Sequence, residues 1–432
     1  MGRGELSRFV GRFKRVMAPS AVNTLGRAVR FSHRERVITP YRLALSLLAS
    51  CATMRVGSLA DIQRCFNALF GTQVAYKPFH NQLAKWRFGD FMRELVSVIL
   101  TQWVVRILSA GHRGAFSEFG RIIIQDGSSF AVKEALREHY PGRFKSKGPA
   151  AVELHVTMDL LNESLSSVVL TPDTFAERPE LPAPEQLTGD LLLADRGYFD
   201  VAYLGLLDAA GARFIVRGYT SINPTVLAAY ATEGTRLKHL SGKCLKDCRL
   251  PKKCALDLDV AWGTGRRAFT ARLVVSWSRA KQEYHYLVTN LARGCYTPEQ
   301  IGQAYRLRWQ IELLFKEWKS YANLHAFDTR NPSIAEGLIW AAIAAAAMKR
   351  YLAHITQVLY GVEVSTRKAA MCAHHVLIDI FRVLATGHSR QLHRAFRAAI
   401  EYLAANALRS HPKRDRKIGR LQLGLKPVIG AA

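Results

Sequence analysis

Residues 304–319 read Ala-Tyr-Arg-Leu-Arg-Trp-Gln-Ile-Glu-Leu-Leu-Phe-Lys-Glu-Trp-Lys, and the interpretation of the whole chain starts from them. Their Leu, Arg, Glu and Lys content favours one continuous helix. At about 100° per residue, one side of this helix carries polar groups: Tyr305, Arg308, Glu312, Lys316 and Lys319. The opposite side is apolar: Leu307, Ile311, Leu314, Phe315 and Trp318. The pattern therefore predicts a helix that packs on one side and presents one carboxylate among three cations on the other.

Two interpretations of the polar side are open. Solvated helices often carry Glu, Lys and Arg, so this could be an ordinary surface helix. However, Trp309 and Leu313 flank the polar side, which suggests that it is partly enclosed. A single carboxylate among cations also suits a divalent metal beside a phosphate chain, because the carboxylate binds the metal while Arg and Lys bind phosphate oxygens. We favour this second interpretation.

The composition indicates a polyanionic partner. At 432 residues the chain should form two or three domains, and its 49% apolar content is ordinary for a soluble globular protein. Its 61 Lys and Arg against 34 Asp and Glu give a net charge of +27. Nucleic acid and an acidic membrane surface both attract such a charge. Nucleic acid is favoured because the charge is spread over the whole chain.

Membrane and secretory segments are not expected. The longest apolar stretch, residues 339–348, is short and Ala-rich and indicates a buried helix. The first forty residues contain no apolar segment of the kind found in secretory signals. Seven irregularly spaced cysteines suggest reduced thiols, so we expect a cytoplasmic protein with no membrane partner.

Residues 1–112 are expected to form a helical DNA-binding domain. Residues 1–36 would be a basic arm or short helix on DNA, or equally a disordered tail. Helices are predicted from Thr39-Pro40 and from Ser58, followed by a short polar helix within 76–87 and a long helix from Phe91 to about Leu108. Helix, Gly-containing turn and basic helix make a helix-turn-helix pattern. The predicted DNA contacts within it are Lys77, Lys85 and Arg87.

The middle of the chain predicts a mixed α/β sheet. Strands are expected at 121–126, 190–195 and 212–217, with a hairpin formed by 152–160 and 164–170 and a helix at 201–210. Residues 113–217 and 293–330 would form this core, and 218–292 a β-rich insertion. Residues 331–432 would be a C-terminal helical region for pairing protomers, with helices at about 333–358, 365–387 and 389–408 and a basic tail at 413–417.

Three carboxylates stand where catalysis would need them. Asp126 and Asp195 each end an apolar strand, and Glu312 lies on the predicted helix. Functional groups gather at strand ends in α/β sheets, and a carboxylate at the end of a buried strand needs a ligand or a hydrogen bond. Each alone is more typical of a turn or a cap. Together, in a basic chain, they predict a site for two Mg²⁺ ions acting on phosphodiesters.

The chain resembles the DDE transposases of bacterial insertion sequences, specifically the fourth insertion-sequence family. That family's signature is Tyr, two residues, Arg, three residues, Glu, six residues and Lys, which Tyr305, Arg308, Glu312 and Lys319 reproduce without a gap. Residues 195–199 are similar to the family's second-Asp block, 126–128 to its first, and 288–291 to the lead-in to the signature. The resemblance covers roughly residues 115–350.

The resemblance implies a ribonuclease-H-like fold with a β insertion before the helix that carries Glu312. Asp126, Asp195 and Glu312 would then be the metal-binding triad, with two Mg²⁺ ions per site and Mn²⁺ as a substitute. Arg308 and Lys319 would bind phosphates of the transposon end, and Tyr305 would position the strand. Further DNA contacts are expected from Lys316 and from Arg196, although Arg196 could instead pair with a carboxylate.

The implied partners are double-stranded DNA, as terminal inverted repeats and as target, and a second copy of the chain in the DNA complex. A nucleoid-associated bacterial protein that excises its element by cut-and-paste is expected. Whether a hairpin intermediate forms, and whether Trp262 or Trp277 then stacks a flipped base, stays open. Two alternative functions are a metal-dependent nuclease without strand transfer and an inactive repressor derived from a transposase.

Three weaker signals are interpreted as structural. His239, Cys244, Cys248 and Cys254 could bind zinc, but they have no Cys-x-x-Cys pair, so free thiols are favoured. His155 lies inside a predicted strand and is expected to be a core histidine and not a catalytic base. Glu317 points away from the polar side of the helix and is excluded from the triad.

Overall fold

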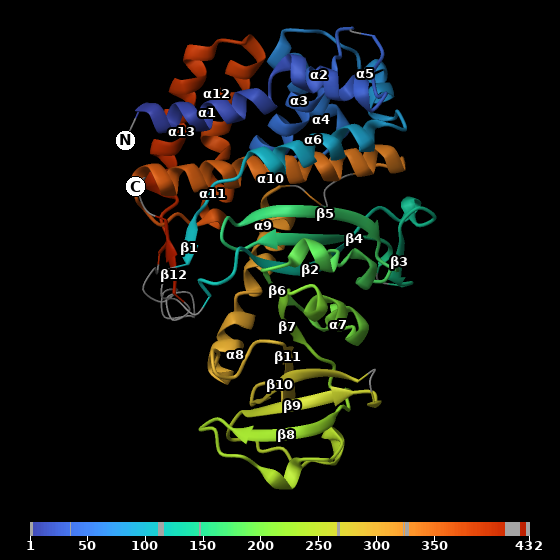
Figure 1. The fold of residues 1–432 in the computed structure, drawn as a ribbon. Coiled ribbons are helices and arrows are strands. Elements are labelled where there is room, and N and C mark those ends of the chain that lie inside the picture. Colours follow the sequence, from blue (N-terminus) through green and yellow to red (C-terminus); the bar gives the residue numbers. More distant parts are fainter. Residues whose placement is uncertain are drawn as a thin grey trace.

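The computed structural model describes residues 3–34, 36–110, 116–146, 148–265, 268–322, 324, 328–410 and 424–428. The basic tail predicted at 413–417 lies outside these residues. Figure 1 shows a layer of helices above a sheet whose strands continue downward into the β-rich region.

A ten-stranded mixed sheet forms the middle and lower parts of the protein, in the order β3-β4-β2-β6-β7-β11-β10-β9-β8, with β5 also paired to β4. Its strands are β2 (Ile122–Ala131), β3 (Pro141–Phe144), β4 (Gly148–Asp159), β5 (Ser164–Pro172), β6 (Leu191–Ala194), β7 (Arg213–Arg217), β8 (Thr225–Ala231), β9 (Leu256–Trp262), β10 (Phe269–Ser278) and β11 (Glu283–Thr289). β2, β6 and β7 are parallel, whereas the other strand pairs are antiparallel. The predicted mixed α/β sheet is therefore confirmed.

The insertion continues the same sheet. Strands β8 to β11 all fall within residues 218–292, and they form an antiparallel meander. β11 pairs with β7 of the core, with Val288 opposite Val216. The insertion thus extends the core sheet sideways, because its last strand completes the open edge of β7. A separate two-stranded sheet joins β1 (Leu108–Ala110) to β12 (Leu425–Pro427).

Helices from both ends of the chain form one layer on one face of the sheet (Figure 1). The α-helices of the whole described chain, including α7 on the opposite face, are α1 (Arg3–Val16), α2 (Pro19–Ala28), α3 (Pro40–Thr53), α4 (Leu59–Phe70), α5 (Tyr76–Leu83), α6 (Phe88–Gln102), α7 (Val201–Ala209), α8 (Pro298–Arg306), α9 (Trp309–Tyr321), α10 (Pro332–Tyr360), α11 (Thr366–Cys372), α12 (His374–Thr386) and α13 (Ser389–Asn406). One hydrophobic core contains residues of α1, α3, α6, α10, α12 and α13 together with inner strand residues such as Ile124 and Leu193. The Tyr41 hydroxyl of α3 donates to the Leu384 carbonyl of α12 at 2.7 Å. The N-terminal and C-terminal helices therefore share one core.

The opposite face of the sheet is covered differently. Leu204 and Leu207 of α7 pack with Leu192, Phe214 and Val288 in a second core. Strand residues alternate between the two cores, because neighbouring side chains of a strand point to opposite faces. Both faces of the parallel strands are thus buried, which explains their continuous apolar sequences.

Helix α10 is the central helix of the helical layer. Among the described residues it is the one single helix long and apolar enough to span a membrane, but 83% of that window is buried inside the protein. The bent pair α11 and α12 passes the same test only when taken together. α10 crosses α6 closely, since Gly337 faces the Phe88 ring and Gly89 faces Glu336. Its apolar sequence is therefore used for packing within the helical layer.

Of the alternatives for residues 1–36, the loose arm and the disordered tail are wrong, and the described part of this segment is mainly helical. α1 and α2 occupy this segment, and Leu6, Val10 and Phe13 are buried at helical spacing. The Phe13 ring stacks on Trp103 at 4.7 Å and meets the edge of Phe396 at 4.8 Å. The apolar residues of α1 thus form a stripe on one side of the helix. This stripe packs against residues from both the N-terminal and the C-terminal part of the chain.

Three predicted helices have different limits. The helix expected to run to Leu108 ends at Gln102, because the backbone of Ile107 and Leu108 instead donates to the Leu161 carbonyl. The helix expected at 365–387 divides into α11 and α12, which meet at a bend of 66°. The opening stretch, 304–319, divides into α8 and α9, since Gln310 and Ile311 donate three residues back, to Leu307 and Arg308, at 3.0 and 3.1 Å.

We expect Gly337→Ala to lower the stability of the helical layer, because a Cβ at this position would overlap the Phe88 ring. Overpacking of this kind typically costs about 1–3 kcal/mol. Gly11→Ala in α1 is a matched control, since its Cβ would meet nothing within 4 Å and alanine favours a helix. Urea unfolding measures both variants. Equal stability of the two variants would contradict the close crossing of α6 and α10.

Candidate active site

Two of the predicted carboxylates stand side by side on the sheet. β2 and β6 are parallel neighbours, with Gln125 opposite Ala194, so Asp126 and Asp195 follow at the same level. Asp126 lies on the same face of β2 as Ile122 and Ile124, which belong to the core beneath the helical layer. Both carboxylates therefore point toward the helices. The strand predicted to end at Asp126 continues to Ala131, because β2 stays paired with β4, so Asp126 lies within β2 where its parallel pairing with β6 ends, whereas Asp195 directly follows β6.

Arg308 joins the helix carboxylate to the sheet. Its Nη1 donates to Oδ2 of Asp126, and its Nη2 donates to Oε1 of Glu312 at 2.6 Å. The side chains of Arg308 and Asp126 are each only 13% exposed, whereas Glu312 is 34% exposed. Because Arg308 lies in the turn between α8 and α9, its guanidinium reaches from the helix pair to the sheet and holds Glu312 beside Asp126.

Tyr305 fixes the second sheet carboxylate. Its hydroxyl donates to Oδ1 of Asp195 at 2.8 Å. Burial raises the pKa of Tyr305 above its usual range, and the neighbouring carboxylate adds to this effect. Tyr305 is thus a neutral hydrogen-bond donor at physiological pH, which orients Asp195 without adding charge.

The two sheet carboxyls have opposite pKa shifts. Burial raises the pKa of Asp126 to about 7, and Asp195 and Glu312 add to this effect while Arg308 opposes it. Burial also acts to raise the pKa of Asp195, but Arg308 and the Tyr305 hydroxyl outweigh it, so that this pKa is lowered overall. Asp195 is therefore ionised throughout the neutral range, whereas Asp126 changes charge within it.

Lys319 contacts the segment that follows Asp126. Its Nζ donates to Oγ of Ser128 at 2.8 Å and to the Ser129 carbonyl at 2.7 Å. Burial lowers the pKa of Lys319. Ser128 was expected only as part of the motif at 126–128, and its contact with Lys319 was not predicted, although its position two residues after Asp126 is the signal that marks it. Gly127 between them has a tight environment, since a Cβ would approach Glu153 and the Tyr198 hydroxyl.

Residues 304–319 form two helices and not one, but the separation into a polar and an apolar side is kept. Leu307, Ile311, Leu314, Phe315 and Trp318 are all buried, as predicted. The enclosure of the polar side comes from the sheet and not from Trp309, whose side chain is 56% exposed. Lys316 and Arg196 are exposed, and no ion pair joins either of them to the described residues.

The donor set suits a hard divalent cation, because all three predicted ligands are carboxylates. Asp126 and Asp195 extend from neighbouring parallel strands, and one guanidinium bonds both Asp126 and Glu312. However, no group of three Asp, Glu, His or Cys side chains within the described ranges is close enough to hold an ion. Arg308 is the reason, since its guanidinium lies between Asp126 and Glu312. A cation bound by both carboxylates would therefore replace at least one of these ion pairs.

The predicted DNA contacts of the helix-turn-helix have different surroundings. α4 ends at Gly71, in the left-handed conformation, and α5 follows after a short turn. Lys77 is exposed on α5. Lys85 instead donates to the Phe31 carbonyl at 3.3 Å, and Arg87 pairs with Asp90 at 2.9 Å. Lys77 is thus the one of the three that is fully directed to solvent.

The contacts of two further residues singled out from the sequence bear on their interpretation, and those of His155 decide it. His155 is buried, with Nε2 2.9 Å from Oγ1 of Thr171, and burial lowers its pKa to about 4. The interpretation as a core histidine is confirmed. The sulfur of Cys248 lies 3.4 Å from the Cys244 carbonyl, and no cluster of metal ligands forms there among the described residues.

The two tryptophans considered for a flipped base lie on the α7 face of the sheet. Trp262 packs against Phe199 and Phe269, with ring centroids 6.2 and 5.9 Å apart. Trp277 stands opposite Tyr284 in register, and the Tyr284 ring packs against the α7 core. The predicted triad points to the other face. Neither ring is therefore beside the carboxylates, and the choice between them remains open.

A mixed sheet with carboxylates side by side on adjacent parallel strands, one within β2 and one directly after β6, and a third on a crossing helix is consistent with a ribonuclease-H-like fold. The family described as "Transposase DDE domain" matches residues 117–348, more than half of the chain. The chain belongs to this family, and it is related to transposases of insertion sequences.

Three relatives illustrate the similarity. The transposase for insertion sequence element IS1151 of Clostridium perfringens is 22% identical over 69% of this chain and 70% of its own length. The transposase for IS231B of Bacillus thuringiensis subsp. berliner is 25% identical over 74% of each chain. The putative transposase InsL for IS186A of Escherichia coli K12 is 45% identical, over 46% of this chain and 60% of its own.

We expect Arg308→Ala to destabilise the metal-free protein by about 3 kcal/mol at pH 8.5, because it leaves partly buried carboxylates without their cation. The loss should shrink at pH 6. The folded-state pKa of Asp126, about 7, lies above its unfolded value, so ionisation costs stability as the pH rises. Without Arg308 this pKa rises further, and the added cost appears only above pH 7.

Urea unfolding at the two pH values in the presence of a chelator measures this effect. Arg306→Ala is the matched control, since Arg306 is exposed two residues earlier in the chain. A defect of Arg308→Ala that is equal at both pH values would contradict the coupling between Arg308 and Asp126.

Proposed function

We propose that this chain is a metal-dependent transposase that cleaves double-stranded DNA at the ends of an insertion sequence and joins the freed ends to a target. The observation that carries the proposal is that Arg308 bonds Asp126 and Glu312 while Tyr305 of the same helix pair bonds Asp195, in a chain of net charge +27. Carboxylates beside buried cations suit phosphodiester chemistry, which needs ligands for metals and partners for phosphate oxygens.

Asp126, Asp195 and Glu312 would hold Mg²⁺, or Mn²⁺ in its place. Two such ions, when bound, activate the attacking oxygen and neutralise charge on the phosphate undergoing in-line displacement. Asp126 must lose its proton to act as a ligand, and its pKa of about 7 makes this step sensitive to pH. Tyr305 keeps Asp195 oriented throughout, because its hydroxyl holds one carboxylate oxygen and leaves the other available.

Arg308 and Lys319 would bind phosphate oxygens of the transposon end. Both cations reach the carboxylate site in the structure, Arg308 through Asp126 and Lys319 through Ser128. Release of Arg308 from both Asp126 and Glu312 would leave two N–H donors directly beside the site, and a guanidinium matches the geometry of a phosphate. Lys316 and Arg196, which are exposed, would contact phosphates farther along the strand.

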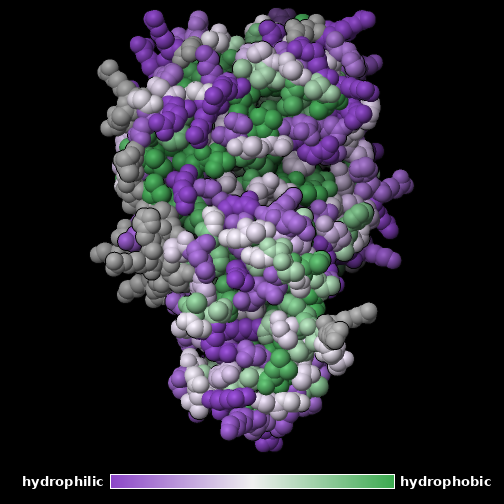
Figure 2. Space-filling model, viewed as in Figure 1, coloured by the Kyte–Doolittle hydropathy of each residue, from purple (hydrophilic) through white to green (hydrophobic). Residues whose placement is uncertain are grey.

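The N-terminal helices would recognise the terminal inverted repeats through α4 and α5. Figure 2 shows hydrophilic residues over both ends of the molecule on the face in view, in keeping with a partner of high charge. Both transposon ends must be cut and joined in concert, so the working form would be a homodimer on DNA in the bacterial cytoplasm. Excision would follow a cut-and-paste route, with or without a hairpin intermediate.

We expect Glu312→Gln to abolish cleavage of DNA carrying the element's terminal repeats while leaving DNA binding intact, because the amide keeps the shape but loses the charge of a ligand. The loss should exceed the roughly 10–100-fold that changes outside the ligand set typically cause. Glu299→Gln is the matched control, since Glu299 is exposed in the first turn of α8. Gel assays with Mg²⁺ measure binding, cleavage and joining. Cleavage by Glu312→Gln at the wild-type rate would remove Glu312 from the triad.

The same assays separate the alternative functions. Wild-type protein that cleaves but yields no joined product would be a nuclease without strand transfer. Wild-type protein that binds the repeats but does not cleave with either Mg²⁺ or Mn²⁺ would be a repressor derived from a transposase.

We expect Lys77→Ala to weaken binding of the terminal repeats and to reduce the dependence of log K on log[salt] by about 1, because one phosphate contact is lost. Lys85→Ala should leave this slope closer to the wild-type value, since its ammonium is bonded to the Phe31 carbonyl. Titrations at several salt concentrations measure both slopes. A larger change for Lys85→Ala than for Lys77→Ala would contradict the assignment of α5 as the DNA-contacting helix.

A further inference from the structure

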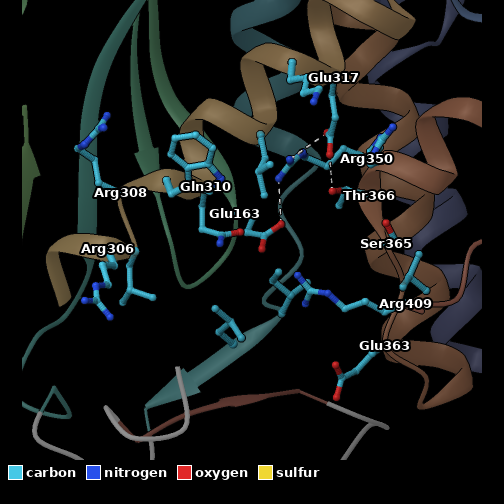
Figure 3. A pocket seen from close by; sticks show the side chains of 18 of the residues that line it. Glu163, Arg306, Arg308, Gln310, Glu317, Arg350, Glu363, Ser365, Thr366 and Arg409 are labelled. Atoms are coloured by element: carbon cyan, nitrogen blue, oxygen red, sulfur yellow. Dashed lines mark hydrogen bonds and ion pairs between the residues drawn. The ribbon is translucent and has the colours of Figure 1, made fainter. Parts of the chain in front are cut away.

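A second polar network lies on the other side of the helix that carries Glu312. Arg350 of α10 stands at its centre, and its Nη1 donates to Oε2 of Glu163 at 2.9 Å while its Nη2 donates to Oε2 of Glu317 at 3.1 Å. The three side chains are only 9–11% exposed. Figure 3 shows both ion pairs and the position of Arg350 between the two carboxylates. A guanidinium that bridges two buried carboxylates fixes both in distance and direction.

Glu317 is also held from a third helix. The Thr366 hydroxyl, at the start of α11, donates to Oε1 of Glu317 at 2.5 Å (Figure 3). A second set of bonds lies at the end of α9. Nζ of Lys349 in α10 donates to the carbonyl of Tyr321 in α9 at 2.8 Å and to the carbonyl of Ala370 in α11 at 3.3 Å. The last turns of α9 are thus tied to α10 and α11 by directional bonds, and both carboxylate oxygens of Glu317 are used.

The other carboxylate of the network belongs to the sheet. Glu163 lies in the turn that joins β4 to β5, where its φ is 43°, and the Leu161 carbonyl of this turn accepts from the backbone of Ile107 and Leu108. β4 pairs directly with β2, with Val156 opposite Asp126. Arg350 therefore connects the strand pair that carries Asp126 to the helix that carries Glu312.

This connection determines where α9 lies along its own axis. Glu317 is about 140° around the helix from Glu312, so it faces the helical layer while Glu312 faces the site. The apolar contacts of α9 are strong but without direction, and they allow a small slide or rotation. A cavity of about 920 Å³ borders α9 and the network, so packing does not close off such a movement.

We propose that Arg350, Glu317 and Glu163 are positioning residues that hold Glu312 at the correct distance from Asp126 and Asp195. The proposal rests on the proposed function of the carboxylates. A positioning role differs from a purely structural one because it affects the distances between the three carboxylates and not only the stability of the fold. Loss of the network shifts α9, moves Glu312 away from its two partners and weakens the affinity of the site for a divalent cation, while the DNA-contacting helices α4 and α5 are unaffected.

The test compares Glu317→Gln with Glu299→Gln in the full-length protein. We expect Glu317→Gln to lower kcat for cleavage by about 10–100-fold at unchanged KM for DNA, the range typical of residues that orient metal ligands. The Mn²⁺ concentration that gives half of the metal-dependent rise in Tm should increase about tenfold. Excess Mn²⁺ should restore much of the rate. Glu299→Gln should match the wild type in all three measurements.

Thr366→Val provides a milder variant, because it keeps the volume of the side chain and removes only one hydrogen bond to Glu317. We expect a shift of the Mn²⁺ midpoint in the same direction at nearly unchanged Tm without metal. Unchanged kcat and Mn²⁺ midpoint in both variants would overturn the proposal. A fall in metal-free Tm with no shift of the Mn²⁺ midpoint would also overturn it, since that result defines a structural role alone.

Failure of the proposed function has a separate signature. If the wild type does not cleave DNA, the Tm titration with Mn²⁺ still reports on the carboxylate site and decides the positioning role by itself. If the wild type gains no stability from Mn²⁺, the three carboxylates do not bind the cation, and the proposed function and the positioning proposal are rejected together.

Discussion

The ion pairs of Arg308 with Asp126 and Glu312 are the interaction on which the site depends. They join a carboxylate fixed in the sheet to one carried by a helix, across a boundary that apolar contacts alone would leave free to slide. The turn between α8 and α9 places the guanidinium there, so the irregularity that divides the signature stretch is part of the site's construction. Because Arg308 is largely buried, its charge also acts to lower the pKa of both Asp126 and Asp195. Burial outweighs this effect at Asp126 and raises its pKa, whereas Arg308 together with the Tyr305 hydroxyl outweighs burial at Asp195 and lowers its pKa.

The helical layer gives this arrangement its support. α10 runs through the layer, contacts helices from both ends of the chain and carries Arg350 toward α9. Two arginines therefore hold α9 from two sides: Arg308 attaches its first turn to β2, and Arg350 attaches its later part to α10 and the β4–β5 turn. A helix held at both sides by directional bonds has little freedom to rotate, which suits the catalytic role proposed for Glu312. The packing of the first thirty residues into the same layer means that the N-terminal helices are part of this support as well as part of the charged surface.

The parallel and antiparallel parts of the sheet contribute differently to the site, as the strand order explains. The parallel strands β2, β6 and β7 place two carboxylates at one edge, whereas the antiparallel strands β8 to β11 extend the sheet without contributing to the triad. Burial of both faces of the parallel strands by two separate cores keeps that edge rigid. The chain thereby combines a carboxylate pair fixed in the sheet with a third carboxylate, the proposed third ligand, on a helix, and membership of the transposase DDE domain family accords with this architecture.

The sequence by itself determined the class of fold, the apolar strand residues that precede Asp126 and Asp195, and the grouping of Tyr305, Arg308, Glu312 and Lys319, because alternation, helical spacing and a gap-free signature are local properties of the chain. It placed the end of the first strand at Asp126, whereas β2 continues to Ala131. It also identified His155 as a core residue. It could not determine that the signature divides into two helices, that residues 3–28 pack into the helical layer, or that Lys85 is bonded to Phe31, since these depend on which distant segments lie opposite. The Arg350 network shows the same limit, because Glu163, Glu317 and Thr366 are far apart in the sequence and no spacing relates them. Only the tertiary structure decided these contacts, since a side chain acquires its partner, its burial and its pKa from the segments that folding brings to it.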